Sequence, residues 1–528
     1  MQLFLTFLAY TLFVAGYSWF KLRKETLNSH EGYFLGGRSL TGVVIAGSML
    51  LTNISTEHLI GMNGSSYKNG FIIIAWEVTS ALALILTAVY FIPKYLKMGL
   101  TTIPQFLENR FDGFTRSLVA FFLMISFIVT LLPIVLYTGA INLESIFNVS
   151  ELLDVSQERG MNITIWAIGL IGSLYAIFGG LKAVAVSDTL NGYGLLIGGL
   201  AIPFLALLSI GEGNPMEGLS MVYHHAPEKF NVIGSKDSVM PFEVLFTGLI
   251  INQIYFWCMN QMIIQRALGA KNLKEAQKGL LLSGLLKILV PLIIILPGVI
   301  GFYYYGDLFY DRQDMIYPEL IKKVLPVSFV GIFAAVVMGA VLSTFNSVLN
   351  SAATIFSIDI FKRLINSRVS DTRLVKIGKI SSAVLALFAI IVAPWVAKAP
   401  DGLYQLLQQL NGIFFIPIAS IMLAGFFLPK ISALAAKAAL LVGLAFYIGC
   451  TFIFKVDLHF VHIWGIEFVL NMSVMGVISY YIPNKKPFKI KDLQIVETKG
   501  WKYTNGFAAF LVLATLLIYV LLGNFSIY

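Results

Sequence analysis

The chain is a succession of apolar segments, each long enough to cross a lipid bilayer. A helix that crosses the hydrocarbon core needs about 20 predominantly apolar residues. Of the 528 residues, 58% are hydrophobic and only 12% are charged, whereas soluble domains carry about 25% charged residues. The sequence therefore predicts an all-α polytopic membrane protein.

We expect about fourteen transmembrane helices at this length per span. The first apolar segment has no basic residue before it and no small-residue cleavage pattern after it, so we count it as a span and not as a signal peptide. The expected ranges are 3–20, 42–65, 71–96, 117–147, 162–178, 183–210, 241–265, 279–304, 326–358, 375–397, 403–427, 431–454, 460–482 and 505–524.

The basic residues lie mostly on one side of these spans. Of the 37 lysines and arginines, 27 fall in one set of loops, 9 in the other set, and Lys287 lies inside a span. Because cytoplasmic loops carry the excess of Lys and Arg, we assign the first set to the cytoplasm. Both termini then lie outside the plasma membrane, or outside the inner membrane of a bacterium. This distribution also explains the net charge of +9 without a nucleic-acid partner.

Two spans are interrupted by polar residues halfway across the membrane. The second span is polar over 52–58, and the seventh contains Asn252, Gln253 and Asn260. Irregular backbone at this depth is tolerated where it lines a cavity, and breaks at corresponding places in two halves indicate an inverted-repeat transporter. We therefore expect one transmembrane domain, with an extra N-terminal helix and loop (1–41), a first repeat (42–210), a second repeat (241–427) and extra C-terminal helices (428–528).

Hydroxyl groups of the ninth span are candidates for a cation site. Ser343 and Thr344 are adjacent, and the interrupted backbone near 51–54 leaves carbonyl oxygens without helical partners. Because hard cations take oxygen ligands, these groups predict a site for a monovalent cation such as Na⁺. Small polar residues also serve as ordinary packing contacts between membrane helices, and this alternative stays open for Ser347 and Ser351.

The ionisable residues Glu77, Lys287 and Asp188 lie inside apolar spans. A charge at the bilayer centre costs at least about 2.5–3.5 kcal/mol, so such residues usually face a partner or a wet cavity. Glu77 and Lys287 would bind a polyhydroxylated solute, together with the amides around Gln408 and with Ser80, which shares a helical face with Glu77. A purely structural ion pair is the alternative. Asp188 is either a cation relay or a helix N-cap.

Five short motifs are spread along the chain. They are the segments 53–57 (NISTE), 76–80 (WEVTS), 175–183 (YAIFGGLKA), 257–271 (WCMNQMIIQRALGAK) and 349–359 (LNSAATIFSID). The third resembles the signature of the sodium:solute symporters, and the others resemble the sodium/sugar branch of that family. The resemblance covers nearly the whole chain. It implies a LeuT-like fold, which is a five-plus-five inverted repeat with additional helices.

The resemblance also implies roles for individual positions. The Na⁺ ligands would be the carbonyls of Leu51, Ile54 and Ala340 and the hydroxyls of Ser343 and Thr344. The solute-binding residues would be His58, Glu77, Ser80, Gln253, Lys287 and Gln408. An inner gate would be Phe256, and the outer gate would be Met62, Trp76 and Tyr404. Asp188 corresponds to an acid implicated in Na⁺ exit.

Four of these positions depart from the pattern expected for galactose binding. His58 stands in place of Gln, Gln253 in place of Asn, and Phe256 and Trp76 each in place of Tyr. Phe256 keeps the stacking face and loses a hydroxyl, and His58 adds a titratable donor beside Lys287. A different hexose, or an anionic sugar derivative, is therefore open as the substrate.

These observations predict a sodium-driven symporter that imports a hexose or hexose derivative by alternating access, with Na⁺ as the co-transported ion. One alternative is a symporter of the same fold for an amino acid or a carboxylate. Another is a sodium-permeable channel or solute sensor. We do not expect an enzyme, because the sequence shows no nucleophile–base pair, metal-ligand cluster or phosphate loop. The sequence leaves the sugar, the Na⁺ stoichiometry and the oligomeric state open.

Overall fold

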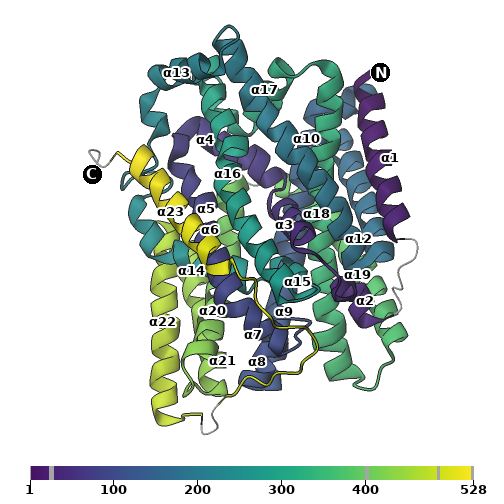
Figure 1. The fold of residues 1–528 in the computed structure, drawn as a ribbon, viewed down its shortest axis with the longest axis vertical. Coiled ribbons are helices and arrows are strands. Elements are labelled where there is room, and N and C mark those ends of the chain that lie inside the picture. The colour runs from purple at the N-terminus through teal and green to yellow at the C-terminus, as the bar shows by residue number, and fades with distance from the viewer. Residues whose placement is uncertain (1, 23–28, 399–402, 485–487, 525–528) are drawn as a thin grey trace.

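Long helices run along the long axis of the molecule (Figure 1). The computed structural model describes residues 2–22, 29–398, 403–484 and 488–524, and within these ranges the protein is all-helical. Twelve helices are long and apolar enough to cross a membrane. Four of the basic residues that we used to assign orientation lie outside the described ranges: Arg23, Lys24, Lys485 and Lys486.

The α-helices follow one another with short connections. Those before residue 240 are α1 (Gln2–Leu22), α2 (His30–Leu35), α3 (Gly42–Asn53), α4 (Asn63–Asn69), α5 (Ala75–Val78), α6 (Ser80–Leu86), α7 (Ile92–Lys97), α8 (Pro104–Arg110), α9 (Gly113–Ile125), α10 (Leu132–Phe147), α11 (Val149–Leu152), α12 (Gln157–Ile210) and α13 (Pro215–His225). Those after it are α14 (Gly248–Cys258), α15 (Gln261–Leu268), α16 (Leu273–Tyr305), α17 (Ile316–Val324), α18 (Val327–Ile355), α19 (Asp371–Val392), α20 (Leu403–Phe427), α21 (Ala433–Ile448), α22 (Phe460–Tyr481) and α23 (Thr504–Leu522). Several continue as π-helix, in η2 (Glu57–Met62), η4 (Thr87–Phe91), η5 (Ser126–Leu131), η9 (Phe356–Ile365) and η11 (Gly449–Ile453).

The two spans with polar interruptions are broken in the structure. In the second span, α3 ends at Asn53, where the amide of Ile54 makes a helical bond to Leu50 O, and the chain resumes as η2 and α4. In the seventh, α14 ends at Cys258, and the side chain of Asn260 caps the N-terminus of α15. Each half is too short to cross a membrane alone. For this reason the twelve long helices of the described chain do not include 42–53 or 241–265, while residues 57–65 belong to the long helical stretch Glu57–Lys97.

Gly180 divides α12 into two candidate spans. Its backbone has φ 60° and ψ −172°, a conformation that only glycine adopts readily. A Cβ at this position would lie 2.8 Å from the carbonyl oxygen of Tyr33. The kink lies between the expected spans 162–178 and 183–210, and the helices on its two sides are long and apolar enough to cross a membrane separately.

The stretches 211–240 and 305–325, which the sequence treats as long loops, contain helices. They hold α13 and α17, which Figure 1 shows at the upper end of the molecule, together with the N-terminus. The opposite end carries α8 and the stretch 488–503, where basic residues are concentrated. We call it the basic end.

Packing around α16 brings the broken spans together. α16 packs against α3, α4, α5 and α6, while α14 packs against α6, α20 and α22. α3 also packs against α12 and α18. The interrupted part of the second span therefore has α16 on one side and α18 on the other.

Candidate functional site

One buried cavity contains all six side chains that the resemblance assigns to the solute. It lies at the breaks that follow α3 and α14, and its volume is about 50 Å³. Pockets for small molecules usually measure about 300–1,000 Å³, so the cavity is contracted in this conformation and must widen to hold a hexose. The six side chains are those of His58, Glu77, Ser80, Gln253, Lys287 and Gln408.

Lys287 of α16 is ion paired with Glu77 of α5, and their side chains are only 1% and 2% exposed. The Lys287 ammonium also donates to Oδ1 of Asn53, the last residue of α3, at 2.6 Å. It lies 5.5 Å from the ring centroid of Trp257. Buried ion pairs persist where further hydrogen bonds satisfy the charged groups. The two charges therefore form a structural pair and line the solute cavity as well.

Ser80 and Gln253 hydrogen bond to each other at the edge of the cavity. Gln253 Oε1 accepts from Ser80 Oγ at 3.0 Å and from Trp257 Nε1 at 3.1 Å. Gln253 Nε2 donates to the carbonyl of Trp76 at 2.8 Å and to Oγ1 of Thr79 at 3.1 Å. Both ends of the Gln253 amide are thus engaged. This residue holds α14 against α5 and α6 and keeps little hydrogen-bonding capacity for a solute.

His58 stands between two carboxylates. Its Nε2 lies 3.9 Å from Glu77 Oε1, and its Nδ1 lies 3.6 Å from Glu57 Oε1. The ring packs edge-on against Tyr404, with centroids 5.4 Å apart. Glu57 is 3% exposed and lines the same cavity, although sequence reasoning assigned it no role. Its place in the polar break, directly before His58, was the available signal.

An aromatic cluster covers the cavity near the expected outer gate. Trp76 packs edge-to-face against Tyr404, with centroids 5.8 Å apart, and against Trp464 of α22, 6.2 Å apart. Met62 is fully buried in the same hydrophobic cluster, but the described residues that line the cavity do not include it. Phe256, the expected inner gate, does line the cavity. Trp464 was missed because it belongs to an extra C-terminal helix outside every motif.

Amide side chains of two helices complete the lining of the cavity. Asn252 of α14 and Asn411 of α20 line it, while Gln405 and Gln409 of α20 do not. Because Gln408 and Asn411 are three residues apart, they share a face of α20. Gln405 is also three residues from Gln408, so helical periodicity alone does not separate the amides that line the cavity from those that do not.

The expected Na⁺ ligands come from α18 and the end of α3, which pack against each other. Thr344 Oγ1 donates to the carbonyl of Thr52 at 3.0 Å. Ser343 Oγ is buried and has no hydrogen-bond partner among the described residues. The other expected ligands, Leu51, Ile54 and Ala340, are fully buried. The hydroxyl of Thr344 therefore lies against the end of α3, which is where the resemblance leads us to expect it.

Asp188 lies well inside α12, so the N-cap interpretation is wrong. A cap residue precedes the first turn of a helix, whereas α12 begins at residue 157 and its kink is at Gly180. The buried Asp188 carboxylate accepts from Ser48 Oγ at 2.7 Å and lies 3.9 Å from Arg266 Nη2. Arg266 in turn hydrogen bonds to Ser48 and Ser347. No pattern in the sequence indicates that Arg266 is the partner of this acid.

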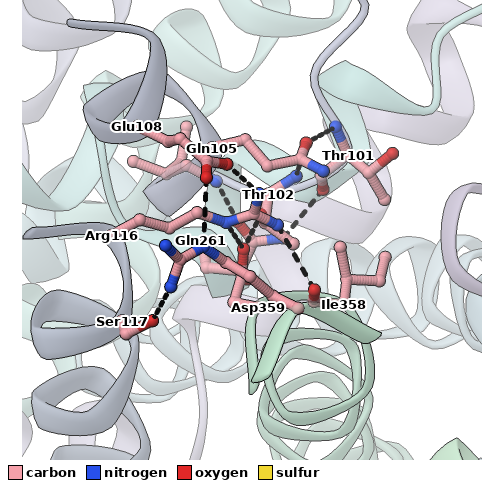
Figure 2. A network of polar contacts seen from close by, with 11 residues as sticks. Thr101, Thr102, Gln105, Glu108, Arg116, Ser117, Gln261, Ile358 and Asp359 are labelled. Carbon is pink, nitrogen blue, oxygen red and sulfur yellow. Dashed lines mark hydrogen bonds and ion pairs between the residues drawn. The ribbon is translucent and has the colours of Figure 1, made fainter. Parts of the chain in front are cut away.

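A second buried polar network lies near the basic end, where η9 meets α9 and the segment around α8 (Figure 2). Asp359 Oδ1 accepts from Arg116 Nε at 2.6 Å and from Thr102 Oγ1 at 2.9 Å. Arg116 is also ion paired with Glu108, and Arg363 Nε donates to the other oxygen of Glu108 at 3.0 Å. The network therefore ties the first half of the chain to the ninth span.

The second half of the broken seventh span joins this network through Gln261 of α15 (Figure 2). Gln261 Oε1 accepts from the amide of Ile103 at 2.8 Å, and its Nε2 donates to the carbonyl of Thr101 at 3.2 Å. Gln105 Oε1 accepts from the amides of Thr101 and Thr102 at 2.8 and 3.1 Å. The segment 101–108 thus connects α15 to η9.

Residues 33–443 match the sequence model of the sodium:solute symporter family. The chain belongs to this family. It is 45% identical over 524 residues to the uncharacterized symporter YidK of Escherichia coli, covering 99% of this chain and 91% of that one. It is 32% identical over 445 residues to the sodium/glucose cotransporter of Vibrio parahaemolyticus, covering 80% of each. A solved structure of a Na⁺-coupled sialic acid symporter in an outward-open state matches with a TM-score of 0.78, at 20% identity over 93% of this chain and 99% of that one.

Family membership establishes the class of activity. The protein is a multi-pass membrane transporter and not an enzyme, its fold is LeuT-like, and its coupling ion is Na⁺. The solute is not decided by the family, because related symporters carry names for different solutes. Evidence about the solute therefore has to come from the chemistry of the cavity.

Proposed function

We propose that this symporter uses the Na⁺ gradient to import a hexose or hexose derivative across the plasma membrane. The observation that carries the proposal is the Glu77–Lys287 pair, which lines one cavity together with amide and imidazole side chains at the two helix breaks. Such a set offers donors and acceptors on several sides of a polyhydroxylated solute. The similarity to the sodium/glucose cotransporter of Vibrio parahaemolyticus supports a sugar as the transported solute.

The topology that we propose has fourteen crossings, in which the broken spans are the second and the seventh. The basic end faces the cytoplasm, because cytoplasmic loops carry the excess of Lys and Arg. Both termini then lie outside, and in a bacterium the membrane is the inner membrane. Spans two to six and seven to eleven form the two inverted repeats, with one helix before them and three after.

Na⁺ binds between the end of α3 and α18 in this proposal. Its ligands are the carbonyls of Leu51, Ile54 and Ala340 and the hydroxyls of Ser343 and Thr344. The Ser343 hydroxyl supports this, because it is buried beside the Asp188 carboxylate and makes no close hydrogen bond within the described chain. An ion in this corner joins the broken second span to the ninth, and in doing so favours the conformation that binds the solute.

The cavity has an outer gate and an inner gate in this proposal, and opening them in turn gives alternating access. Trp76, Tyr404 and Met62 separate the solute from the outside, and Phe256 separates it from the inside. Na⁺ must bind more tightly to the solute-competent conformation, since a ligand with equal affinity for both shifts nothing. Asp188, close to the corner on the neighbouring helix α12, assists Na⁺ exit on the cytoplasmic side.

The driving force is sufficient for concentrative uptake. One charge moving through about 100 mV contributes about 2.3 kcal/mol, and a tenfold Na⁺ gradient adds about 1.4 kcal/mol. The sum, about 3.7 kcal/mol, supports a solute gradient of several hundredfold at a one-to-one ratio.

Uptake by purified protein in liposomes tests the proposal. An inward Na⁺ gradient should drive accumulation of at least one radiolabelled hexose above its external concentration, and an equal K⁺ gradient should not. A panel of neutral hexoses, acidic hexoses, amino acids and carboxylates identifies the solute class. Na⁺-driven uptake of an amino acid without uptake of any sugar would overturn the proposal, and so would solute-independent Na⁺ flux without accumulation.

A further inference from the structure

Most polar groups that line the solute cavity are already hydrogen bonded to the protein. The Lys287 ammonium donates to Glu77 and Asn53. The amide of Gln253 is engaged at both ends, and Ser80 donates to it. These groups fix the shape of the cavity. The atoms that remain without partners are the ones available to a solute.

The fully buried atoms of the cavity lining that lack a partner are mainly acceptors. Glu57 Oε2, Asn252 Oδ1 and Asn411 Oδ1 are buried and have no hydrogen-bond partner within the described chain. All three residues line the cavity, and Nδ1 of His58 is unpartnered as well. Carboxylate and amide oxygens only accept hydrogen bonds, and leaving them unpaired in the interior is unfavourable. A solute that fits must therefore bring donors, and hydroxyl groups are such donors.

The charges of the cavity favour the same kind of solute. Two carboxylates and one ammonium line it, those of Glu57, Glu77 and Lys287, and no arginine is among its described lining residues. Lys287 is paired with Glu77, so its charge is compensated. Glu57 forms no ion pair with a lysine or arginine of the described chain, and the imidazole of His58 lies 3.6 Å from its carboxylate.

We propose that Glu57 selects against acidic solutes, and that the substrate is an uncharged, hydroxyl-rich sugar. This inference rests on the proposed sugar transport and goes beyond it, because it names the charge class of the sugar and the residue that sets it. A carboxylate or sulfate group in the cavity meets the Glu57 charge in an environment where water screens it poorly. His58 and Lys287, which suggest an acidic sugar in the sequence, both face protein carboxylates in the structure.

Uptake measurements with matched neutral and acidic sugars test the proposal. Na⁺-driven uptake into liposomes is measured for glucose, galactose, glucuronate and galacturonate, which differ only in C4 configuration and in the acid group. Glucose is paired with glucuronate and galactose with galacturonate, and the pair that contains the better-transported neutral sugar is compared. In the unmodified protein, that neutral sugar should have an apparent affinity at least about tenfold higher than the corresponding acidic sugar, a factor equivalent to 1.4 kcal/mol. This comparison needs no variant.

The variant Glu57→Gln assigns the selectivity to one side chain. It keeps the shape of Glu57 and removes its charge, so the ratio of neutral to acidic affinity should fall at least about fivefold. Glu319→Gln, in α17, where the partly exposed carboxylate pairs with Lys322, is the matched control and should leave the ratio unchanged.

Three results would overturn the inference. The first is equal transport of a sugar and its acid by the unmodified protein. The second is an unchanged ratio in a folded Glu57→Gln variant. The third is absence of Na⁺-driven uptake for all sugars in the wider panel, which also overturns the proposed function; the first two results leave that function intact.

Discussion

The ammonium of Lys287 in α16 and the carboxylate of Glu77 in α5 meet directly beside the break that ends α3, although the two residues are 210 positions apart. Asn53, at that break, accepts a second hydrogen bond from Lys287. The pair is therefore sensitive to the position of the broken helix. Any movement of α3 relative to α16 changes the surroundings of both charges, which would connect the Na⁺ site that we propose at the end of α3 to the cavity.

Replacing one member of this pair should be more harmful than replacing both. Glu77→Gln leaves a buried ammonium without its counter-ion, and such a loss typically costs about 3–5 kcal/mol. The double variant Glu77→Gln with Lys287→Met leaves no uncompensated charge and should recover part of that stability. Thermal unfolding in detergent measures both. In transport assays, Glu77→Gln should weaken solute affinity at least about tenfold, with Na⁺ binding largely retained. Normal solute affinity in this variant would place Glu77 outside the site.

Ser343→Ala should raise the Na⁺ concentration needed for half-maximal uptake. A hydrogen-bonding group that contacts a charge contributes about 1.5–3 kcal/mol, which corresponds to a shift of at least about tenfold. Ser381→Ala in α19, whose hydroxyl bonds to the carbonyl of Gly378 within its own helix, is the control and should leave the Na⁺ dependence unchanged. If both variants behave alike, Ser343 is a packing residue and the proposed Na⁺ corner loses its main support.

Gly180→Ala should destabilise the junction between the two halves of α12. The alanine must adopt a positive φ, which costs about 1–3 kcal/mol for a residue with a side chain, and its Cβ would press against the carbonyl of Tyr33. Gly16→Ala, in α1, places a methyl group in open space and should be neutral or slightly stabilising. The free energies of unfolding of the two variants in detergent measure the difference. Equal stabilities would mean that the kink is not required by the fold.

Asp359→Asn should weaken the network that joins the two halves of the chain near the basic end. It removes the buried negative charge beside Arg116 and leaves Glu108 as the remaining counter-ion of that guanidinium, so we expect a loss of about 3 kcal/mol or more. The exposed pair of Glu319 and Lys322 is a suitable comparison, because Glu319→Gln should cost at most about 1 kcal/mol. Thermal unfolding measures both. A loss for Asp359→Asn as small as for the exposed pair would show that the network does not hold the two halves together.

The sequence predicted the approximate positions of the twelve long apolar helices, because hydrophobicity over twenty residues is a local property; two further crossings by the broken spans stay a prediction. It also located both helix breaks, since a run of polar residues at membrane depth is stable only where the backbone lines a cavity. It did not predict α13 and α17, which lie in stretches too polar and too short to register as spans. The amphipathic periodicity of residues 316–324 was the available signal for α17.

The candidate site was predicted in part. The motifs brought together six side chains that line one cavity, yet they did not show that the Gln253 amide is occupied by Trp76, Thr79 and Trp257. They also left Glu57 without a role and Arg266 without its partner Asp188. Hydrogen bonds between distant segments leave no periodicity in the sequence, so pattern analysis cannot find them.

The sequence by itself determined that this chain crosses a membrane many times, that two of its helices are broken, and which family it belongs to. The spans and the breaks follow from the hydrophobicity of local segments, which governs their transfer into lipid. The family follows from short motifs. Only the tertiary structure decided which polar atoms are already hydrogen bonded within the protein and which remain available to a ligand. That division depends on how helices far apart in the chain pack against one another, and no single segment contains the information.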